Sequence, residues 1–209
     1  DRIEKDSFMF IYSRIKKYKI LKIIDKERSS SLLKSIYKKY PNNNEVLSLI
    51  ANNYRDQNKC DKAIEIYNKL IKLSVNKDNF YYLKAICLDK LNKWEDSKKI
   101  LIELISRNPN DAYVLNYLSY SMAVRNEDLI QAKKLIFRAL KIEKNNGFFL
   151  DTLGWIQFKL NEIDKAIRTI QIAIELEPDN SEIIDHLGDI YYKTDRKKEA
   201  IYEWKRALI

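Results

Sequence analysis

The sequence predicts an all-α solenoid, a stack of two-helix repeats, and three observations support this fold class. The chain of 209 residues contains only three Gly and three Pro, whereas hairpins and sandwiches need many such turn residues. Its hydrophobic residues, 45% of the total, are enough to fill a sizeable core. A pattern of apolar and small residues also returns at a spacing of 34 residues. A solenoid repeats one structural unit in this way, so each unit is expected to pack on its neighbours.

The 34-residue spacing is clearest toward the C-terminus. Leu150–Gly154 aligns with Ile184–Gly188 at this offset, and Ala166 aligns with Ala200. Counting back in this register, and allowing one extra residue after the corner at 125–128, divides the chain into five units, 44–77, 78–111, 112–146, 147–180 and 181–209.

The residue types at these positions have a packing reason. Two helices approach closely only where small residues lie between them, which explains Gly154 and Gly188 in the first helix and Ala166 in the second. Pro109 and Pro178 follow the second helices of their units, because proline cannot continue a helix.

These residues resemble the tetratricopeptide repeat, whose pattern runs W-x₂-L-G-x₂-Y, then A-x₃-F, then P. The match is strong over 147–209 and weakest in 78–111, where Lys84, Ala85 and Ser97 replace the usual Leu, Gly and Ala. The resemblance implies a right-handed superhelical solenoid that serves as a scaffold for protein–protein interaction and not as an enzyme.

Residues 1–43 are less regular. They are expected to form a degenerate N-terminal repeat over about 10–43, in which Ser29-Ser30-Ser31 cap the second helix. Terminal repeats are often atypical because one of their faces meets solvent. An independent amphipathic helix pair is the alternative interpretation.

The formal net charge of +9 is unevenly distributed. Residues 1–77 carry a net +9, residues 78–146 a net +3 and residues 147–209 a net −3. Lysines on solvated helix faces are the simplest explanation of the basic third. An anionic membrane surface or an acidic partner near residues 14–39 is the next, and RNA comes third, so a nucleic-acid partner is not expected.

The sequence offers little catalytic chemistry. It contains one histidine, His186, which is expected to be a polar residue on a first helix and not a base. Phosphate-binding glycine loops and the H-E-x-x-H motif are missing, and Cys60 and Cys87 lack the spacing of a metal site. We therefore expect no enzyme, no metal, no cofactor and no small-molecule substrate.

The concave surface is the expected binding site, because the first helices of a two-helix solenoid line that side. If Leu153 and Gly154 belong to the packing stripe, the neighbouring aromatic and acidic residues face the groove. Aromatic residues are enriched at binding hot spots, and the acidic residues predict a partner with basic or amide-rich segments. An alternative is that Trp155 and Phe158 only pack between repeats. The predicted partner-binding residues are Asn116, Tyr120, Phe148, Asp151, Trp155, Phe158, Lys159, Asp185, Asp189 and Tyr192.

A narrower resemblance concerns Leu115–Ala123, the extra residue before Gln131, Leu150–Trp155 and Asp185–Asp189. Together these segments are similar to bacterial repeat lipoproteins that act as adaptors for a carboxyl-terminal processing protease. That family implies a periplasmic, outer-membrane-associated scaffold that presents substrates, held near the membrane by an anchor preceding Asp1. Without this resemblance, a cytoplasmic protein is expected.

Two hypotheses of function remain. The first is a scaffold or adaptor that binds a protein or peptide in the groove between Tyr113 and Tyr192. The second is a structural solenoid segment of a larger chain or assembly, in which downstream sequence or another copy would bury Leu208 and Ile209. RNA binding is a distant third.

Overall fold

The computed structural model of the protein describes residues 8–208. Over this range the regular secondary structure is helical, in pairs of antiparallel helices joined by short turns. The chain divides into two compact units, Asp1–Leu104 and Ile105–Ile209, called here the N-terminal and C-terminal units. The all-α class and the two-helix solenoid predicted from the sequence are confirmed.

The N-terminal unit has one continuous hydrophobic core. Ile15 and Tyr18 from its first helix and Leu33 from its second are buried together with Leu47 and Tyr67 from the next pair. The first two helices are therefore part of the same packed stack as those that follow. The helices of this unit are α1 (Phe8–Ile24), α2 (Lys26–Lys39), α3 (Asn44–Asp56), α4 (Cys60–Leu73), α5 (Asp78–Lys90) and most of α6 (Trp94–Arg107).

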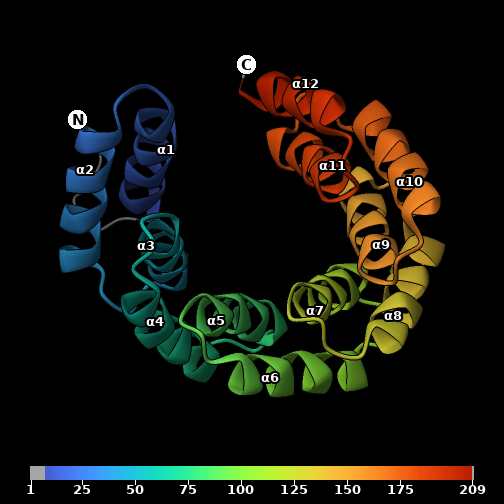
Figure 1. The fold of residues 1–209 in the computed structure, drawn as a ribbon. Helices are drawn as coiled ribbons and strands as arrows, with labels where there is room; N and C mark the ends of the chain where they lie inside the picture. Colours follow the sequence, from blue (N-terminus) through green and yellow to red (C-terminus); the bar gives the residue numbers. More distant parts are fainter. Residues whose placement is uncertain (1–7, 209) are drawn as a thin grey trace. The chain divides into compact units, whose positions relative to one another are not determined.

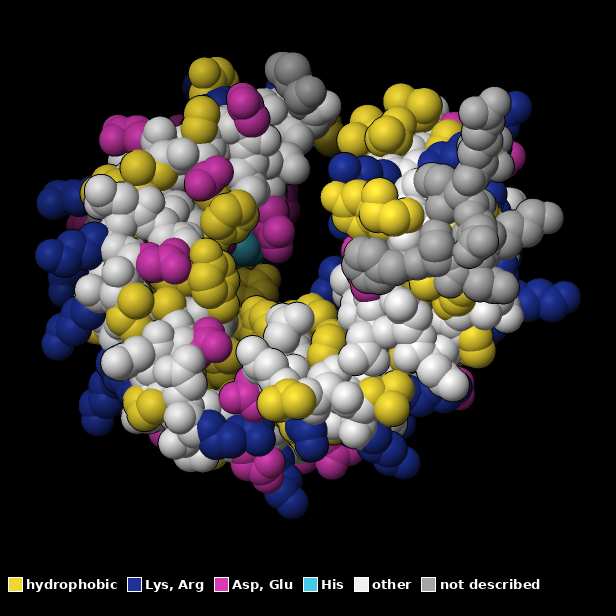
Figure 2. Space-filling view, turned by 180° about the vertical axis from the view of Figure 1, so that it is seen from behind, with side chains coloured by type: hydrophobic (Ala, Val, Ile, Leu, Met, Phe, Trp, Pro, Cys, Tyr) yellow, Lys and Arg dark blue, Asp and Glu magenta, His cyan; other side chains and the backbone are white. Residues whose placement is uncertain are grey.

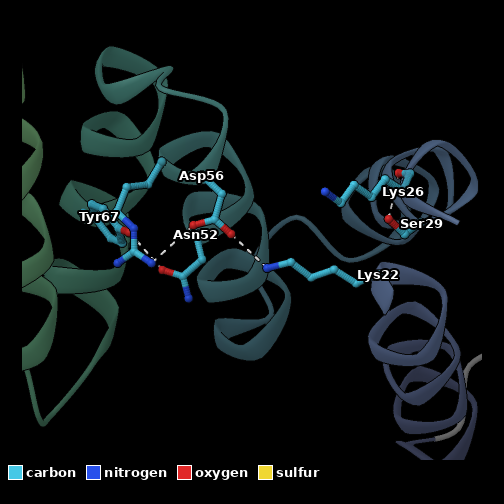
Figure 3. A network of polar contacts seen from close by, with 7 residues as sticks. Lys22, Lys26, Ser29, Asn52, Asp56 and Tyr67 are labelled. Carbon is cyan, nitrogen blue, oxygen red and sulfur yellow. Dashed lines mark hydrogen bonds and ion pairs between the residues drawn. The ribbon is translucent and has the colours of Figure 1, made fainter. Parts of the chain in front are cut away.

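Polar contacts connect the helices at one edge of this core (Figure 3). Lys22 Nζ on α1 lies 2.8 Å from Asp56 Oδ2 at the end of α3. Burial raises the pKa of Asp56, but the positive charges of Lys22 and Arg55 outweigh it and hold the pKa below its usual value. Deeper in the unit, the Tyr67 hydroxyl donates to Asn52 Oδ1 at 2.9 Å. These bonds fix α3 against both α1 and α4.

The predicted serine cap of α2 is wrong. The helix begins at Lys26, and its cap is Asp25, whose Oδ1 accepts a hydrogen bond from the Arg28 amide at 3.0 Å. Ser29 lies inside the helix, buried, and donates to the Lys26 carbonyl at 2.8 Å (Figure 3). An aspartate one turn earlier supplies the cap, so the helix starts before the serines are reached.

Asn or Asp occupies the left-handed position, which glycine usually takes, in most of the turns inside the helix pairs. In the five helix pairs from α3–α4 to α11–α12, one residue of the turn has a φ between 57° and 62°, and neighbouring examples lie 34 or 35 residues apart. Asn and Asp adopt this left-handed conformation more readily than other non-glycine residues, which explains how a chain with so few glycines makes five sharp turns. These residues are Asn58, Asn92, Asn126, Asn161 and Asp195.

The turn between α7 and α8 is one residue longer than the other four. The extra residue leads to Asp128, which has a φ of 33° and accepts a hydrogen bond from the Gln131 amide at 3.0 Å. The insertion expected at this corner is thus accommodated in the turn, where Asp128 becomes the N-cap of α8.

The weak match to the repeat pattern between α5 and α6 has a local compensation. Ser97, which replaces the usual alanine, is fully buried, and its hydroxyl donates to the Ala85 carbonyl at 2.8 Å. A buried hydroxyl is tolerated when it is hydrogen-bonded, so the two helices still approach closely.

The C-terminal unit consists of two layers of helices (Figure 1). The first helices, α7, α9 and α11, lie side by side, and α9 contacts both of the others. We call the exposed surface of these three helices the first-helix face. After the last helix, Leu208 is 87% exposed, and Ile209 lies outside the described residues. The helices are α7 (Ala112–Val124), α8 (Leu129–Ile142), α9 (Gly147–Lys159), α10 (Ile163–Leu176), α11 (Ser181–Lys193) and α12 (Lys197–Ala207).

Candidate protein-binding site

The centre of the first-helix face is a buried acid–base pair between two repeats. His186 Nδ1 on α11 lies 2.9 Å from both carboxylate oxygens of Asp151 on α9. The two side chains are only 12% and 10% exposed. A carboxylate in this position requires a partner, because an isolated buried charge is strongly unfavourable. The pair therefore joins α9 to α11 directly.

The charge state of His186 follows from its neighbours. Burial lowers the pKa of the imidazole, but the hydrogen bond and negative charge of Asp151, together with Glu182 and Asp189, outweigh this effect. The net result is a pKa above the usual value of 6.5. The protonated imidazole is thus favoured by the fold over a wider pH range than in an unfolded chain.

Aromatic rings enclose this pair. The Trp155 ring stacks on the His186 imidazole, with centroids 4.6 Å apart and an interplanar angle of 26°. The Tyr120 ring on α7 is tilted by 40° to the same imidazole, with centroids 6.3 Å apart. Burial, with the charges of Glu182 and Asp151, raises the pKa of the Tyr120 hydroxyl, so it stays a neutral hydrogen-bonding group.

A small pocket opens beside the acid–base pair, where α7, α9 and α11 meet. It has a volume of about 120 Å³. Asn116 supplies an acceptor to its wall, because Oδ1 is buried and meets no hydrogen-bond donor among residues 8–208. We call it the α7–α11 pocket. Its lining consists of Asn116, Tyr120, Phe148, Asp151, Thr152, Asn180, Glu182 and Ile183.

A second, open hollow of about 400 Å³ adjoins the pocket. Phe148 lines both, and Tyr113 borders the hollow on the α7 side. Both rings are about half exposed. Figure 2 shows acidic side chains (magenta) among hydrophobic ones (yellow) along this face, while Lys and Arg (dark blue) project mainly from the opposite edge of the unit. The face thus offers apolar contact area next to negative charge.

The structure brings four of the ten predicted site residues together in the α7–α11 pocket, namely Asn116, Tyr120, Phe148 and Asp151. The other predicted residues lie elsewhere on or beside the same face. Lys159 Nζ lies over the Trp155 ring at 5.3 Å, and Asp185 is exposed. Tyr192 is half exposed and packs on Trp204 of α12 at 5.4 Å.

The expectation that Asp151 points into an open groove is wrong in part. This side chain is almost buried, because it is bonded to His186, and only an edge of it reaches the pocket. Trp155 and Phe158 pack in part against the core between α10 and α11, as the alternative interpretation allowed. Phe148, in contrast, is 50% exposed and available for contact.

Three pocket residues on α11 and its cap were missed by sequence reasoning, together with the structural role of His186. Asn180 caps α11 by accepting from the amides of Glu182 and Ile183. His186 lies 35 residues after Asp151, one residue more than the repeat length. Side chains at equivalent positions of adjacent repeats are neighbours, so an Asp and a His at nearly this spacing were a usable signal.

The described part of the chain contains no group of three or more His, Cys, Asp or Glu side chains placed to hold a metal ion. Of the helices between residues 8 and 208, none has the length and apolar character needed to cross a membrane.

Comparison with known families gives two matches. The model of the anaphase-promoting complex, cyclosome, subunit 3 matches residues 30–104, and a tetratricopeptide repeat model matches residues 152–209. A TPR repeat-containing protein of Pseudomonas aeruginosa is 28% identical over 113 residues, which is 54% of this chain and 19% of that protein. The aligned region thus spans about a fifth of the relative's length.

Solved structures show the same fold. A tetratricopeptide repeat protein from Parabacteroides merdae superposes with a TM-score of 0.72 at 15% identity, over 95% of this chain and 78% of that one. A thermophilic TPR protein from Thermus thermophilus gives a TM-score of 0.72 at 22% identity, over 79% and 90% of the two chains. MamA from Desulfovibrio magneticus gives 0.61 at 14% identity, over 79% and 93%. With the helix pairs, these likenesses show that the chain has the fold of tetratricopeptide repeat proteins.

Proposed function

We propose that the chain is a protein-interaction scaffold that binds an extended segment of a partner on the first-helix face of its C-terminal unit. The observation that carries this proposal is the exposure of Phe148 beside the α7–α11 pocket. A half-exposed aromatic ring next to a pocket is the kind of anchor on which binding energy concentrates.

The exposed aromatic surface is continuous, which favours the binding of an extended partner segment over contact with a single partner residue. The pocket and the open hollow share Phe148, and Tyr113 extends the apolar surface along α7. Tyr192 is half exposed on α11. Aromatic side chains of this kind provide large contact areas at low entropic cost. A partner chain that crosses from α7 to α11 would contact all of them.

We extend the proposal to the identity of the partners. The segments Leu115–Ala123, Leu150–Trp155 and Asp185–Asp189 resemble the adaptor lipoproteins of carboxyl-terminal processing proteases. Two of these segments supply the Asp151–His186 pair, and the first supplies Asn116 and Tyr120 of the pocket. On this proposal, the bound segment belongs to such a protease or to a substrate that the scaffold presents to it.

Site-specific photo-cross-linking tests the proposal. A benzoylphenylalanine replaces Phe148 on the first-helix face or, as a matched control, Phe137 on α8. The two positions are similarly exposed, at 50% and 46%, but lie on different layers of the same unit. Cross-linked products from an extract of the cells that make the protein are then identified by mass spectrometry.

The proposal predicts a defined adduct from position 148 and none of that mass from position 137. Equal yields of the same adduct from both positions would contradict it. A third probe at Tyr202, which is 66% exposed on α12, addresses the structural alternative. Adducts formed there alone would favour a solenoid segment that joins a neighbour through its last helix.

A further inference from the structure

We propose that the α7–α11 pocket holds one cationic side chain, a lysine or an arginine, of the segment bound on the first-helix face. This inference rests on the proposed function and adds the chemistry of its central contact. It concerns the pocket lined by Asn116, Tyr120, Phe148 and Glu182 and their neighbours.

The size of the pocket limits what can enter it. Its volume is about 120 Å³, well below the roughly 300 to 1,000 Å³ of pockets that enclose a drug-sized ligand. It is several times the roughly 30 Å³ that one water molecule occupies in the liquid. The pocket is therefore matched to a single side chain and not to a cofactor or a metabolite.

The walls offer acceptors and carry no positive side chain. Oδ1 of Asn116 is buried and meets no donor within residues 8–208. The Glu182 side chain adds a carboxylate at the rim, and none of the eight lining residues is a lysine or an arginine. A donor that carries a positive charge satisfies both groups, whereas an anion would be repelled by Glu182 and would leave Asn116 Oδ1 without a partner.

The stem of a lysine or arginine also finds suitable surroundings. Tyr120 and Phe148 line the same pocket and offer apolar ring surface to the methylene groups. A cation near such a ring gains a further electrostatic attraction. A polar side chain without a stem, such as serine, would leave these rings uncovered.

The carboxylates on α11 also favour a cationic side chain in the pocket. Asp151 is compensated by His186, with which it shares a hydrogen bond, so the pair contributes little net charge when the imidazole is protonated. Glu182, Asp185 and Asp189 on α11 remain as further carboxylates. Lys159 is a positive group on α9, but its ammonium lies over the Trp155 ring and the residue does not line the pocket.

The test uses four capped amino acids as probes, so no natural partner has to be known. They are the Nα-acetyl methylamides of lysine, arginine, norleucine and glutamate, titrated into the full 209-residue chain. Chemical shifts of the Asn116 side-chain amide and of the His186 imidazole report on occupancy. Norleucine has the apolar stem without the charge, and glutamate reverses the charge.

The expected result is saturable shifts with lysine or arginine and weaker binding, or none, with norleucine and glutamate. Glu182→Gln should weaken binding of the cationic probe about two- to fivefold, as for the loss of an exposed ion pair. Glu175→Gln, an exposed carboxylate on α10, should leave it unchanged. Circular dichroism establishes that both variants keep their helices.

Equal binding of lysine and norleucine, or no effect of Glu182→Gln, would overturn the inference. So would the absence of saturable shifts with either cationic probe. The cross-linking experiment at position 148 separates this failure from a failure of the proposed function. A defined adduct there, without any preference for cations, would sink the pocket assignment alone, whereas the loss of both signals would sink both.

Discussion

Replacing His186 with alanine is the sharpest test of the pair that joins α9 to α11. The change removes a hydrogen bond to the Asp151 carboxylate and the stacking contact with Trp155. A hydrogen bond to a charged group contributes about 1.5 to 3 kcal/mol, and an aromatic contact adds about 0.5 to 1.5 kcal/mol. Because Asp151 stays buried, His186→Ala should lower the free energy of unfolding by about 2 to 4.5 kcal/mol.

Urea denaturation followed by circular dichroism measures this loss, and the repeat itself provides the control. Asp151 and Asp185 occupy equivalent positions 34 residues apart, but the second is exposed. Asp151→Asn should therefore destabilise the protein, whereas Asp185→Asn should change the free energy of unfolding by less than about 0.5 kcal/mol.

A double-mutant cycle measures the coupling between Asp151 and His186. If the two side chains stabilise the fold through their mutual contact, the combined Asp151→Asn and His186→Ala variant should lose less stability than the sum of the single variants. Strict additivity, or a loss below about 0.5 kcal/mol for His186→Ala, would refute the reasoning.

Three further outcomes are expected. Because the folded pKa of His186 lies above 6.5, the stability it contributes should be fully present below about pH 6.5 and should fall as the pH rises through the folded pKa; a histidine pKa below 6.5, measured by NMR titration, would contradict this. Gly154→Ala should destabilise the protein by about 1 to 3 kcal/mol in urea denaturation, because the added Cβ would lie 2.4 Å from Ile170 Cγ1, and unchanged stability would show that the helices can separate freely. Cys60 and Cys87 are buried free thiols, and burial together with the contact with Cys60 raises the pKa of Cys87 to about 12. Neither thiol should react with Ellman's reagent at pH 8 until urea unfolds the chain, so rapid labelling of the folded protein would show that this region opens.

The repeating framework could be predicted from the sequence because it depends on a few positions that recur. Gly154 and Gly188 mark close approaches between helices, and an added Cβ would lie within 2.5 Å of a side chain on the partner helix at both. The turn residues, of which Asn58 and Asn92 are examples, recur with the same period. Signals of this kind are local, so a single sequence is sufficient to read them.

The α7–α11 pocket could be predicted only in part, because it depends on contacts between repeats. Helical spacing within one repeat placed Asp151 on the first-helix face, and only a comparison with the next repeat could have indicated that His186 covers it. The same limit applies to Trp155, whose exposure depends on that imidazole. The error at Ser29 has a local cause, since Asp25 is an equally favoured capping residue and comes one turn earlier.

The claim that the partner binds on the first-helix face is tested most directly by comparing its affinity for a variant of that face with its affinity for a variant of the second-helix layer. Once the partner cross-linked at position 148 is identified, its dissociation constant is measured by titration calorimetry against Phe148→Ala and Phe137→Ala. The account predicts a loss of about tenfold or more for the first variant, the size of a hot-spot residue, and less than about twofold for the second. Equal losses, or a larger loss for Phe137→Ala, would contradict a binding site on the first-helix face.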